Sequence, residues 1–239
     1  MKSEISSVNE NAGFMTLANV RAARSALNAH GFLLIPGGYP REFCDSLVRV
    51  IDDYRPDERA EKNYAGSELR IWDAQKKHPL FTRFCEDSNF FVSCVEGTEM
   101  EAHTLLAIRN LAVPNHDASL LKGRWHLDSF RRMLKVFLFL TDTNEKSGPF
   151  EFVANTNRTS FKLKMFCAGR VIRPSDLIHK KRAYSRLDDN WIEGLGPQGY
   201  PSTPVLCQAG TVLVIDTSAI HRARPCIEGS RYALTAYYR

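Results

Sequence analysis

Two short segments of the sequence, far apart along the chain, carry residue types that bind metal ions. His126 and Asp128 are separated by one residue within the segment 123–128, and His221 lies far downstream. An extended backbone, or a turn just after the histidine, would let His126 and Asp128 reach one ion. A lone His-x-Asp is weak evidence because chance supplies it often. With His221 it makes two imidazoles and one carboxylate, the facial set of ligands that holds non-haem Fe(II) and leaves further positions open.

An arginine downstream of His221 adds a second element to this pattern. We expect His221 to close the strand-like run 210–216, and Arg231, ten residues after His221, to open the run 232–238. The planar guanidinium of arginine donates two parallel hydrogen bonds to a carboxylate. Arg231 is therefore a candidate to bind a carboxylate group beside a metal ion.

The composition indicates one globular domain. The chain has 239 residues, 44% of them apolar, which is enough for one sizeable core. A net charge of +5 with scattered basic residues predicts no nucleic-acid partner. Six cysteines without a C-x-x-C pair favour reduced thiols. Since neither a signal peptide nor a membrane span is evident, we expect a cytoplasmic protein without membrane contact, whose oligomeric state the sequence leaves unknown.

The first part of the chain is predicted to be mainly helical. Residues 1–13 are polar and expected to be flexible. Thr16 and Gly31 supply start and stop signals for a first helix, and Pro40 opens a second. The expected elements are helices at 16–29, 40–55, 79–86 and 89–96 and strands at 32–35 and 69–72.

Strands dominate the chain from Thr104 onward. Runs rich in β-branched and aromatic residues predict strands at 103–109, 133–142, 150–153, 210–216 and 232–238. This order predicts a mainly β fold with flanking helices, an antiparallel double-stranded β-helix (a jelly-roll or cupin-like barrel) with helices on one face. We expect residues 14–239 to form a single domain, with 159–203 as a variable lid over the mouth of the site.

The motif of His-x-Asp, a distant histidine and an arginine ten residues later resembles that of Fe(II)/2-oxoglutarate dioxygenases. The sequence from residue 31 to the C-terminus resembles the phytanoyl-CoA dioxygenase (PhyH-like) family. It shares the helix, Gly-Phe strand and Pro-initiated helix at its start, and a later strand followed by Asn144 and Gly148-Pro149. The segment 155–158, Asn-Thr-Asn-Arg, departs from the Gly-Ser-His-Arg-like corner of that family, so the role of this corner stays open.

The resemblance implies Fe(II), 2-oxoglutarate and O2 as cofactor and cosubstrates, with release of succinate and CO2. His126, Asp128 and His221 would hold the iron, and Arg231 would bind the far carboxylate of 2-oxoglutarate. Asp128 favours hydroxylation, because related halogenases have a small residue there that leaves space for chloride. We predict hydroxylation of a small polar metabolite. The alternatives are desaturation, cyclisation or demethylation at the same centre, or a non-catalytic cupin-like binding protein.

Each of these four residues also has a purely structural alternative. His126 and Asp128 could form a capped surface turn, His221 could be a satisfied core histidine, and Arg231 could reach solvent from an edge strand. All of these explanations would have to hold together while the spacing still matched the family. We therefore favour the metal site.

Two further residues are weaker candidates for binding the cosubstrate. On the strand 133–141, alternation places Lys135 on the same face as Phe137, Phe139 and Thr141. An inward-facing Lys135 would contact a carboxylate of 2-oxoglutarate or of the substrate, whereas at the barrel rim it would reach solvent. Leu105 aligns with an apolar residue that lines the cosubstrate pocket in the family, and a plain core leucine fits equally well.

Other residues around the motif have a functional and a structural interpretation. Trp125 either walls the site or packs in the core, and Asp216 either supports His221 or caps a strand end. A set of charged and aromatic residues would make the mouth electropositive and suit an anionic substrate, or would form an ordinary solvated surface. This set consists of Arg70, Trp72, Arg131, Arg132, Arg222 and Arg224.

Overall fold

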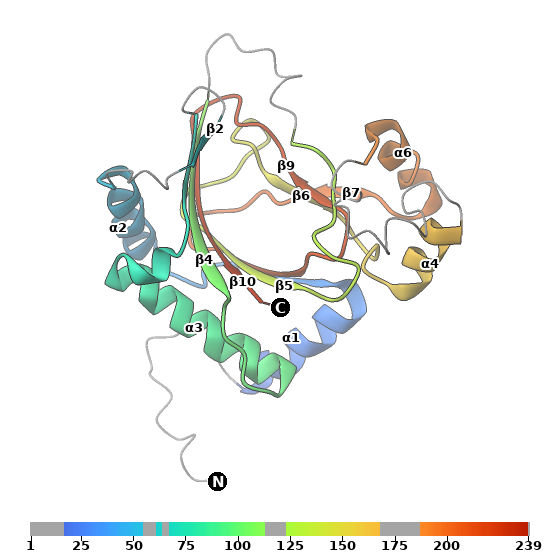
Figure 1. Cartoon of the computed structure of the whole chain (residues 1–239), viewed down its shortest axis with the longest axis horizontal. Helices are drawn as coiled ribbons and strands as arrows, with labels where there is room; N and C mark the ends of the chain where they lie inside the picture. The colour runs from blue at the N-terminus through green and yellow to red at the C-terminus, as the bar shows by residue number, and fades with distance from the viewer. Residues whose placement is uncertain (1–16, 55–60, 64–66, 113–122, 168–186, 239) are drawn as a thin grey trace.

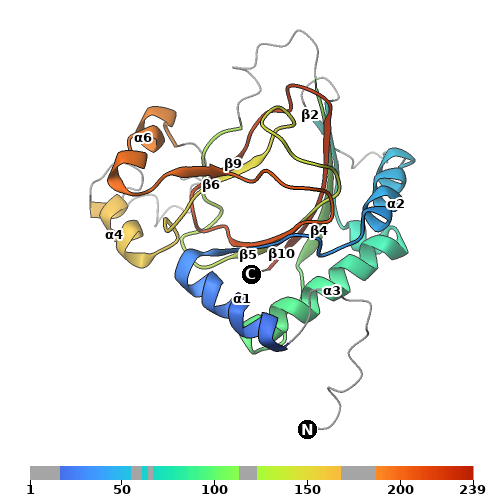
Figure 2. The same cartoon turned by 180° about the vertical axis from the view of Figure 1, so that it is seen from behind.

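Two antiparallel sheets dominate the computed structural model, which describes residues 17–54, 61–63, 67–112, 123–167 and 187–238. Three helices lie on the outer face of the larger sheet, and two lie beside the smaller sheet (Figures 1 and 2). The helices are α1 (Leu17–His30), α2 (Arg41–Asp52), α3 (Pro79–Glu96), α4 (Thr159–Cys167) and α6 (Asp189–Glu193), with 3-10 turns η2 (Ala74–Lys76) and η4 (Gly196–Gln198). The prediction of a mainly β fold with flanking helices is therefore confirmed.

The larger sheet has seven strands in the order β1-β8-β5-β10-β4-β3-β2, and the smaller has three in the order β7-β6-β9. The strands of the larger sheet are β1 (Phe32–Ile35), β2 (Glu61–Asn63), β3 (Glu68–Ile71), β4 (Thr104–Leu111), β5 (Leu134–Phe139), β8 (Val212–Asp216) and β10 (Ser230–Tyr237). Those of the smaller sheet are β6 (Phe150–Val153), β7 (Ser202–Pro204) and β9 (His221–Ala223). Within the described residues both sheets are open.

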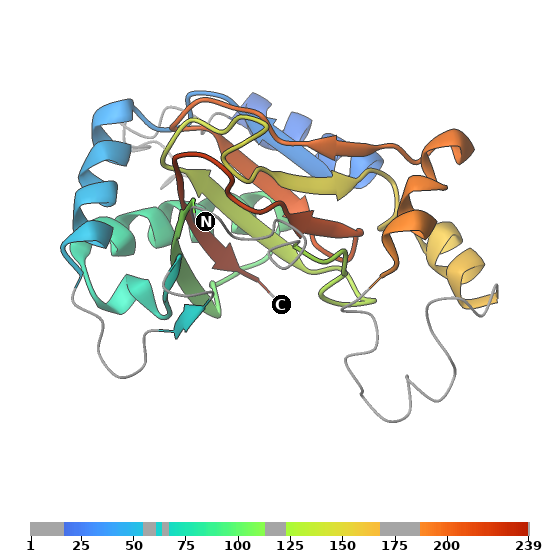
Figure 3. The same ribbon diagram turned by 90° about the horizontal axis from the view of Figure 1, so that it is seen from above.

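Chain segments from β4 onward pass repeatedly between the two sheets. His126 forms an antiparallel bridge with His221 of β9, so its segment lies along the edge of the smaller sheet. β4, β5, β8 and β10 belong to the larger sheet, whereas the segment of His126, β6, β7 and β9 belong to the smaller one. Figure 3 shows the two sheets from above, with α4 and α6 at one end of the molecule. This course brings His126 beside His221.

The larger sheet separates two apolar layers. On its outer face, Leu105, Val136 and Leu234 pack with residues of α1, α2 and α3. On its inner face, Phe139 and other strand residues pack against the smaller sheet, and this inner layer contains Phe137, Phe139, Phe150, Phe152, Leu213 and Ile215. Because side chains alternate along a strand, neighbouring residues of β4, β5, β8 and β10 enter opposite layers.

Two local predictions were wrong. The segments 79–86 and 89–96 form the single helix α3, because Ser88 is buried and the apolar face continues through Phe91. Gly97, with φ of 78°, ends this helix. His221 does not close the strand of residues 210–216, since β8 ends at Asp216 and a turn leads to β9 in the other sheet.

The predicted flexible N-terminus, residues 1–13, lies outside the described residues, as does the central part of the predicted lid, 168–186. The described parts of 159–203 form α4, α6, η4 and the start of β7. None of the helices described has both the length and the apolar composition needed to cross a membrane.

We expect Gly210→Ala to destabilise the protein. Gly210 has φ of 86°, and a Cβ there would lie 2.0 Å from the carbonyl oxygen of Tyr39. The strain and the clash should lower the free energy of unfolding by about 2 kcal/mol or more, measured by urea denaturation. Gly196→Ala is the control, because its Cβ would meet nothing within 4 Å. Equal unfolding midpoints for the two variants would contradict the close approach.

Candidate functional site

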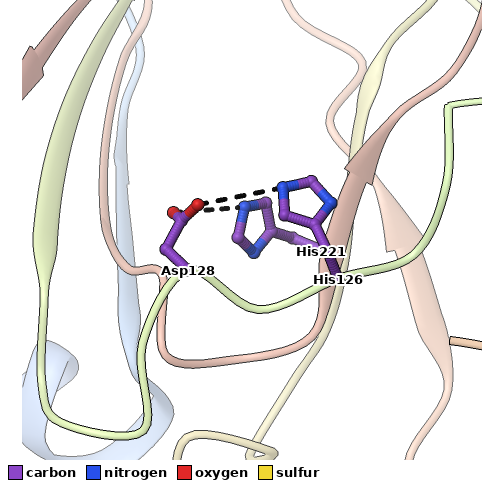
Figure 4. A group of neighbouring side chains, drawn as sticks. All are labelled: His126, Asp128 and His221. Atoms are coloured by element: carbon purple, nitrogen blue, oxygen red, sulfur yellow. Dashed lines mark ion pairs between the residues drawn. The ribbon is translucent and has the colours of Figure 1, made fainter. Parts of the chain in front are cut away.

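The side chains of His126, Asp128 and His221 converge between the two sheets (Figure 4). Nε2 of His126 lies 3.8 Å from Oδ1 of Asp128, and Nε2 of His221 lies 3.5 Å from Oδ2 of Asp128. One potential ligand atom from each residue lies within 4.8 Å of the others. The structure thus brings together the three residues expected from the sequence, in an arrangement that can hold a metal ion.

Backbone pairing holds the two segments in place. The amide of His126 donates to the carbonyl of His221 at 3.0 Å, and the amide of His221 donates to the carbonyl of His126 at 2.8 Å. The amide of Asp128 donates to the carbonyl of Thr217 at 3.0 Å. A Cβ on Gly123 would lie 1.5 Å from the carbonyl oxygen of Ala223, so only glycine permits this approach to β9.

Both imidazoles are oriented by backbone carbonyls. Nδ1 of His126 donates to the carbonyl of Arg124 at 2.8 Å, and Nδ1 of His221 donates to that of Ala219 at 2.9 Å. Because a carbonyl only accepts, the proton of each neutral ring lies on Nδ1 and leaves Nε2 with a free lone pair. Burial, together with the nearby His126, lowers the pKa of His221 to about 3, so His221 is neutral at pH 7.

Solvent reaches the cluster from one side. The side chain of His126 is 33% exposed and that of Asp128 is 19% exposed, whereas that of His221 is only 3% exposed. The ring of Phe150 stacks on that of His221, with centroids 5.4 Å apart. The site is therefore closed behind His221 and accessible beside His126.

Lys135 lies against the carboxylate of Asp128. Its Nζ is 2.8 Å from Oδ2 of Asp128 and 4.2 Å from the centroid of the Tyr237 ring, and its side chain is 8% exposed. Burial alone would raise the pKa of Asp128, but His221 and then the charge and hydrogen bond of Lys135 outweigh it and lower the pKa to about 2. Lys135 faces inward, so the alternative at the barrel rim is excluded. Its contact with the carboxylate of Asp128 was not foreseen from the sequence.

Arg231 is a buried cation on β10. Its Nη2 donates to Oδ1 of Asn110 on β4 at 2.8 Å, and Asn110 donates to Glu68 on β3 at 2.9 Å. Among the described residues, no carboxylate forms an ion pair with Arg231. Burial lowers the pKa of Arg231, and nearby Cys226 and Glu68 offset part of this effect. A buried guanidinium that faces a neutral amide retains the capacity to bind an anion.

Leu105 is not brought to the site. It is fully buried in the outer layer with the helices, while its neighbour Leu106 has the opposite orientation on β4. Leu105 is therefore a residue of the hydrophobic core, as the structural alternative expected. Asp216 accepts from the amides of Met133 at 3.2 Å and Ser218 at 3.0 Å, so it caps the end of β8.

Trp125 and most of the arginines have structural partners. Trp125 is buried in an apolar cluster, with the guanidinium of Arg222 4.2 Å from its ring. Arg222 and Arg224 both donate to buried Glu151, at 2.7 Å and at 2.8–2.9 Å.

The other residues of the expected electropositive mouth are also paired or exposed. Arg70 pairs with Glu68 and Arg132 with Glu96. Arg131 is exposed, and Trp72 contacts Tyr237 with centroids 6.0 Å apart. These ion pairs leave little excess positive charge for an electropositive mouth.

Several solved structures share this fold, although no protein-family model matches the chain and no curated protein matches it in sequence. The non-haem alpha-ketoglutarate-dependent epimerase SnoN from nogalamycin biosynthesis has a TM-score of 0.67 and 16% identity, over 92% of this chain and 83% of that chain. HygX from Streptomyces hygroscopicus, with nickel and 2-oxoglutarate bound, has a TM-score of 0.60 and 16% identity, over 91% and 86%. EctD from S. alaskensis has a TM-score of 0.67 and 14% identity, over 97% and 79%. At these identities the likeness shows a common fold.

We expect Lys135→Met to weaken divalent metal binding. The ammonium group orients Asp128, and loss of a partner that orients a metal ligand typically reduces metal affinity by roughly 10- to 100-fold. The affinity is measured by titration with Mn²⁺, with free Mn²⁺ followed by electron paramagnetic resonance. Lys146→Met is the control, since Lys146 forms an exposed pair with Glu228. Equal Mn²⁺ affinity in the two variants would show that Asp128 is held without Lys135.

Proposed function

We propose that the protein is an Fe(II)- and 2-oxoglutarate-dependent oxygenase of the PhyH-like type. The observation that carries this proposal is the convergence of His126, Asp128 and His221, with both Nδ1 atoms bound to carbonyls and both Nε2 atoms free. The course of the strands between the two sheets supports a double-stranded β-helix. The shared fold with SnoN and HygX, whose descriptions name alpha ketoglutarate or 2-oxoglutarate, supports the cosubstrate.

The residues present fit this metal and this cosubstrate. Two imidazoles and one carboxylate form the facial set that suits Fe(II) and leaves positions for other ligands. 2-Oxoglutarate carries two carboxylates, and a dicarboxylate needs a cation at the end far from the metal. Arg231 supplies a buried guanidinium without a carboxylate partner among the described residues.

Bound Fe(II) and 2-oxoglutarate supply, with O2, an oxidant for an unactivated C–H bond, and succinate and CO2 are released. Four residues of the chain would prepare that chemistry. Arg231 binds and orients the cosubstrate, and Lys135 holds the carboxylate of Asp128 in place. Phe150, against the ring of His221, excludes water from the closed side. The exposed side of His126 leaves the approach for the substrate.

The substrate in this proposal is a small polar metabolite, and the reaction is hydroxylation. Epimerisation or ring closure of the substrate is the second candidate reaction. The epimerase SnoN and the carbocyclase SnoK, with a TM-score of 0.66 at 15% identity over 95% of this chain and 85% of that chain, support it. Desaturation and demethylation are further alternative reactions at the same metal centre. The intact ligand set argues against a non-catalytic cupin-like binding protein.

The proposed location of the protein is the cytoplasm. Six free cysteines support it, because reduced thiols are typical of that compartment.

We expect the wild-type protein to develop a weak visible absorption band when Fe(II) and 2-oxoglutarate are added without oxygen. His126→Ala should abolish the band because it removes an iron ligand, and Asp128→Ala should stop succinate formation in air. His103→Ala is the control, since His103 is exposed at the start of β4. A band that survives in His126→Ala would rule out this assignment of the metal ligands.

We expect Arg231→Gln to weaken 2-oxoglutarate binding while Fe(II) affinity stays unchanged. Loss of a buried charge-assisted pair costs about 2 kcal/mol or more, which corresponds to roughly 30-fold in affinity. The same band, titrated with 2-oxoglutarate, gives the dissociation constant. Arg41→Gln is the control, because Arg41 forms an exposed pair with Asp142. Unaltered 2-oxoglutarate binding in Arg231→Gln would locate the anion site elsewhere.

A further inference from the structure

A buried hydroxyl on β10 has no hydrogen-bond partner among the described residues. Thr235 is 1% exposed, and no described residue forms a hydrogen bond with its Oγ1. A hydroxyl in this condition has lost its hydrogen bonds to water without replacement, which destabilises the folded chain. A valine has nearly the same shape and would avoid this penalty. A hydrogen bond from a bound ligand would remove the energetic cost of this buried hydroxyl.

The position of Thr235 points to a ligand. Alternation places Arg231, Ala233, Thr235 and Tyr237 on one face of β10. Thr235 is paired with Phe137 of β5, which belongs to the inner layer, whereas Leu234 belongs to the outer layer. The hydroxyl therefore lies on the face of the sheet that looks toward the smaller sheet and the metal ligands.

The same face of β10 connects the two charged groups of the site. Tyr237 pairs with Lys135, whose ammonium group contacts both the Tyr237 ring and Asp128. At the other end of the strand lies Arg231, the buried cation without a carboxylate partner among the described residues. Between Arg231 and Thr235 the only inward side chain of this strand is the methyl group of Ala233. No bulky side chain of β10 therefore separates the guanidinium of Arg231 from the hydroxyl of Thr235.

We infer that Thr235 donates a hydrogen bond to the metal-side end of bound 2-oxoglutarate, so that Arg231 and Thr235 hold the two ends of one dicarboxylate from a single strand. This inference rests on the proposed function and identifies a further binding residue for its cosubstrate. Thr235 lies within the strand-like run 232–238, but the sequence patterns gave it no role in binding. Within the described part of the chain the hydroxyl has no partner, so the ligand would supply its hydrogen bond.

Two variants test this inference. Thr235→Val removes the hydroxyl and keeps the shape, and Thr235→Ser keeps the hydroxyl and removes a methyl group. The dissociation constant of 2-oxoglutarate is measured without oxygen from the visible band of the Fe(II)-loaded protein. We expect Thr235→Val to raise it five- to tenfold, which is about 1–1.4 kcal/mol, and Thr235→Ser to stay within about twofold of the wild type. Fe(II) affinity should be the same in all three proteins.

A second readout needs no ligand. The thermal unfolding midpoint of metal-free and 2-oxoglutarate-free Thr235→Val should equal or exceed that of the wild type, because the variant loses an unsatisfied buried hydroxyl. A lower midpoint with unchanged 2-oxoglutarate binding would show that the hydroxyl is bonded within the protein, and would overturn the inference. So would equal weakening of Fe(II) and 2-oxoglutarate binding, or a Thr235→Ser variant as weak as Thr235→Val.

The outcome also separates this inference from the proposed function. If the wild type binds 2-oxoglutarate and Thr235→Val binds it equally well, only the role of Thr235 is refuted. If the wild type with Fe(II) gives no band at any 2-oxoglutarate concentration, the proposed function fails, and the inference fails with it.

Discussion

The reciprocal pair of backbone hydrogen bonds between His126 and His221 is the interaction on which the site depends. It joins two segments that are distant in sequence, and it adds the segment of His126 to the edge of the smaller sheet. Gly123 permits the approach because a side chain there would collide with the backbone of Ala223. The carbonyls of nearby residues then orient both imidazoles, so the position of the candidate metal ligands follows from the pairing of the main chain.

The inner layer combines aromatic packing with a few buried charges. Phe137, Phe139 and Phe150 exclude water, and in such surroundings a charged group must have a partner or meet a ligand. Lys135 and Asp128 satisfy this requirement for each other. Arg231 has a neutral amide as its described hydrogen-bond partner, and the hydroxyl of Thr235 has none. The guanidinium of Arg231 and the hydroxyl of Thr235 lie on the same face of β10. One anion on that face could therefore accept hydrogen bonds from both groups.

Local sequence patterns predicted most of the fold, and the types and spacing of four residues predicted which side chains to examine. Local sequence patterns could not predict contacts that depend on the register of the strands. Leu105 was a candidate for the cosubstrate pocket and, equally, for the core. A shift of one residue reverses the face of a strand, and Leu106 is the residue on the inner side. The pairing of Lys135 with Asp128 depends on how a turn folds back over β5, which no periodicity encodes. Thr235 could have been noticed only as a polar residue within an apolar strand.

The carbonyl contacts of the two histidines have a consequence for the thermodynamics of metal binding at the proposed site. Each ring already has its orientation and tautomer set by a main-chain oxygen two residues earlier, and the carboxylate of Asp128 is held by an ammonium group. Little rotamer entropy remains to be lost when an ion arrives, so the site is preorganised. A chelator that strips the ion would then leave the scaffold intact, in contrast to small zinc domains whose folding requires the metal.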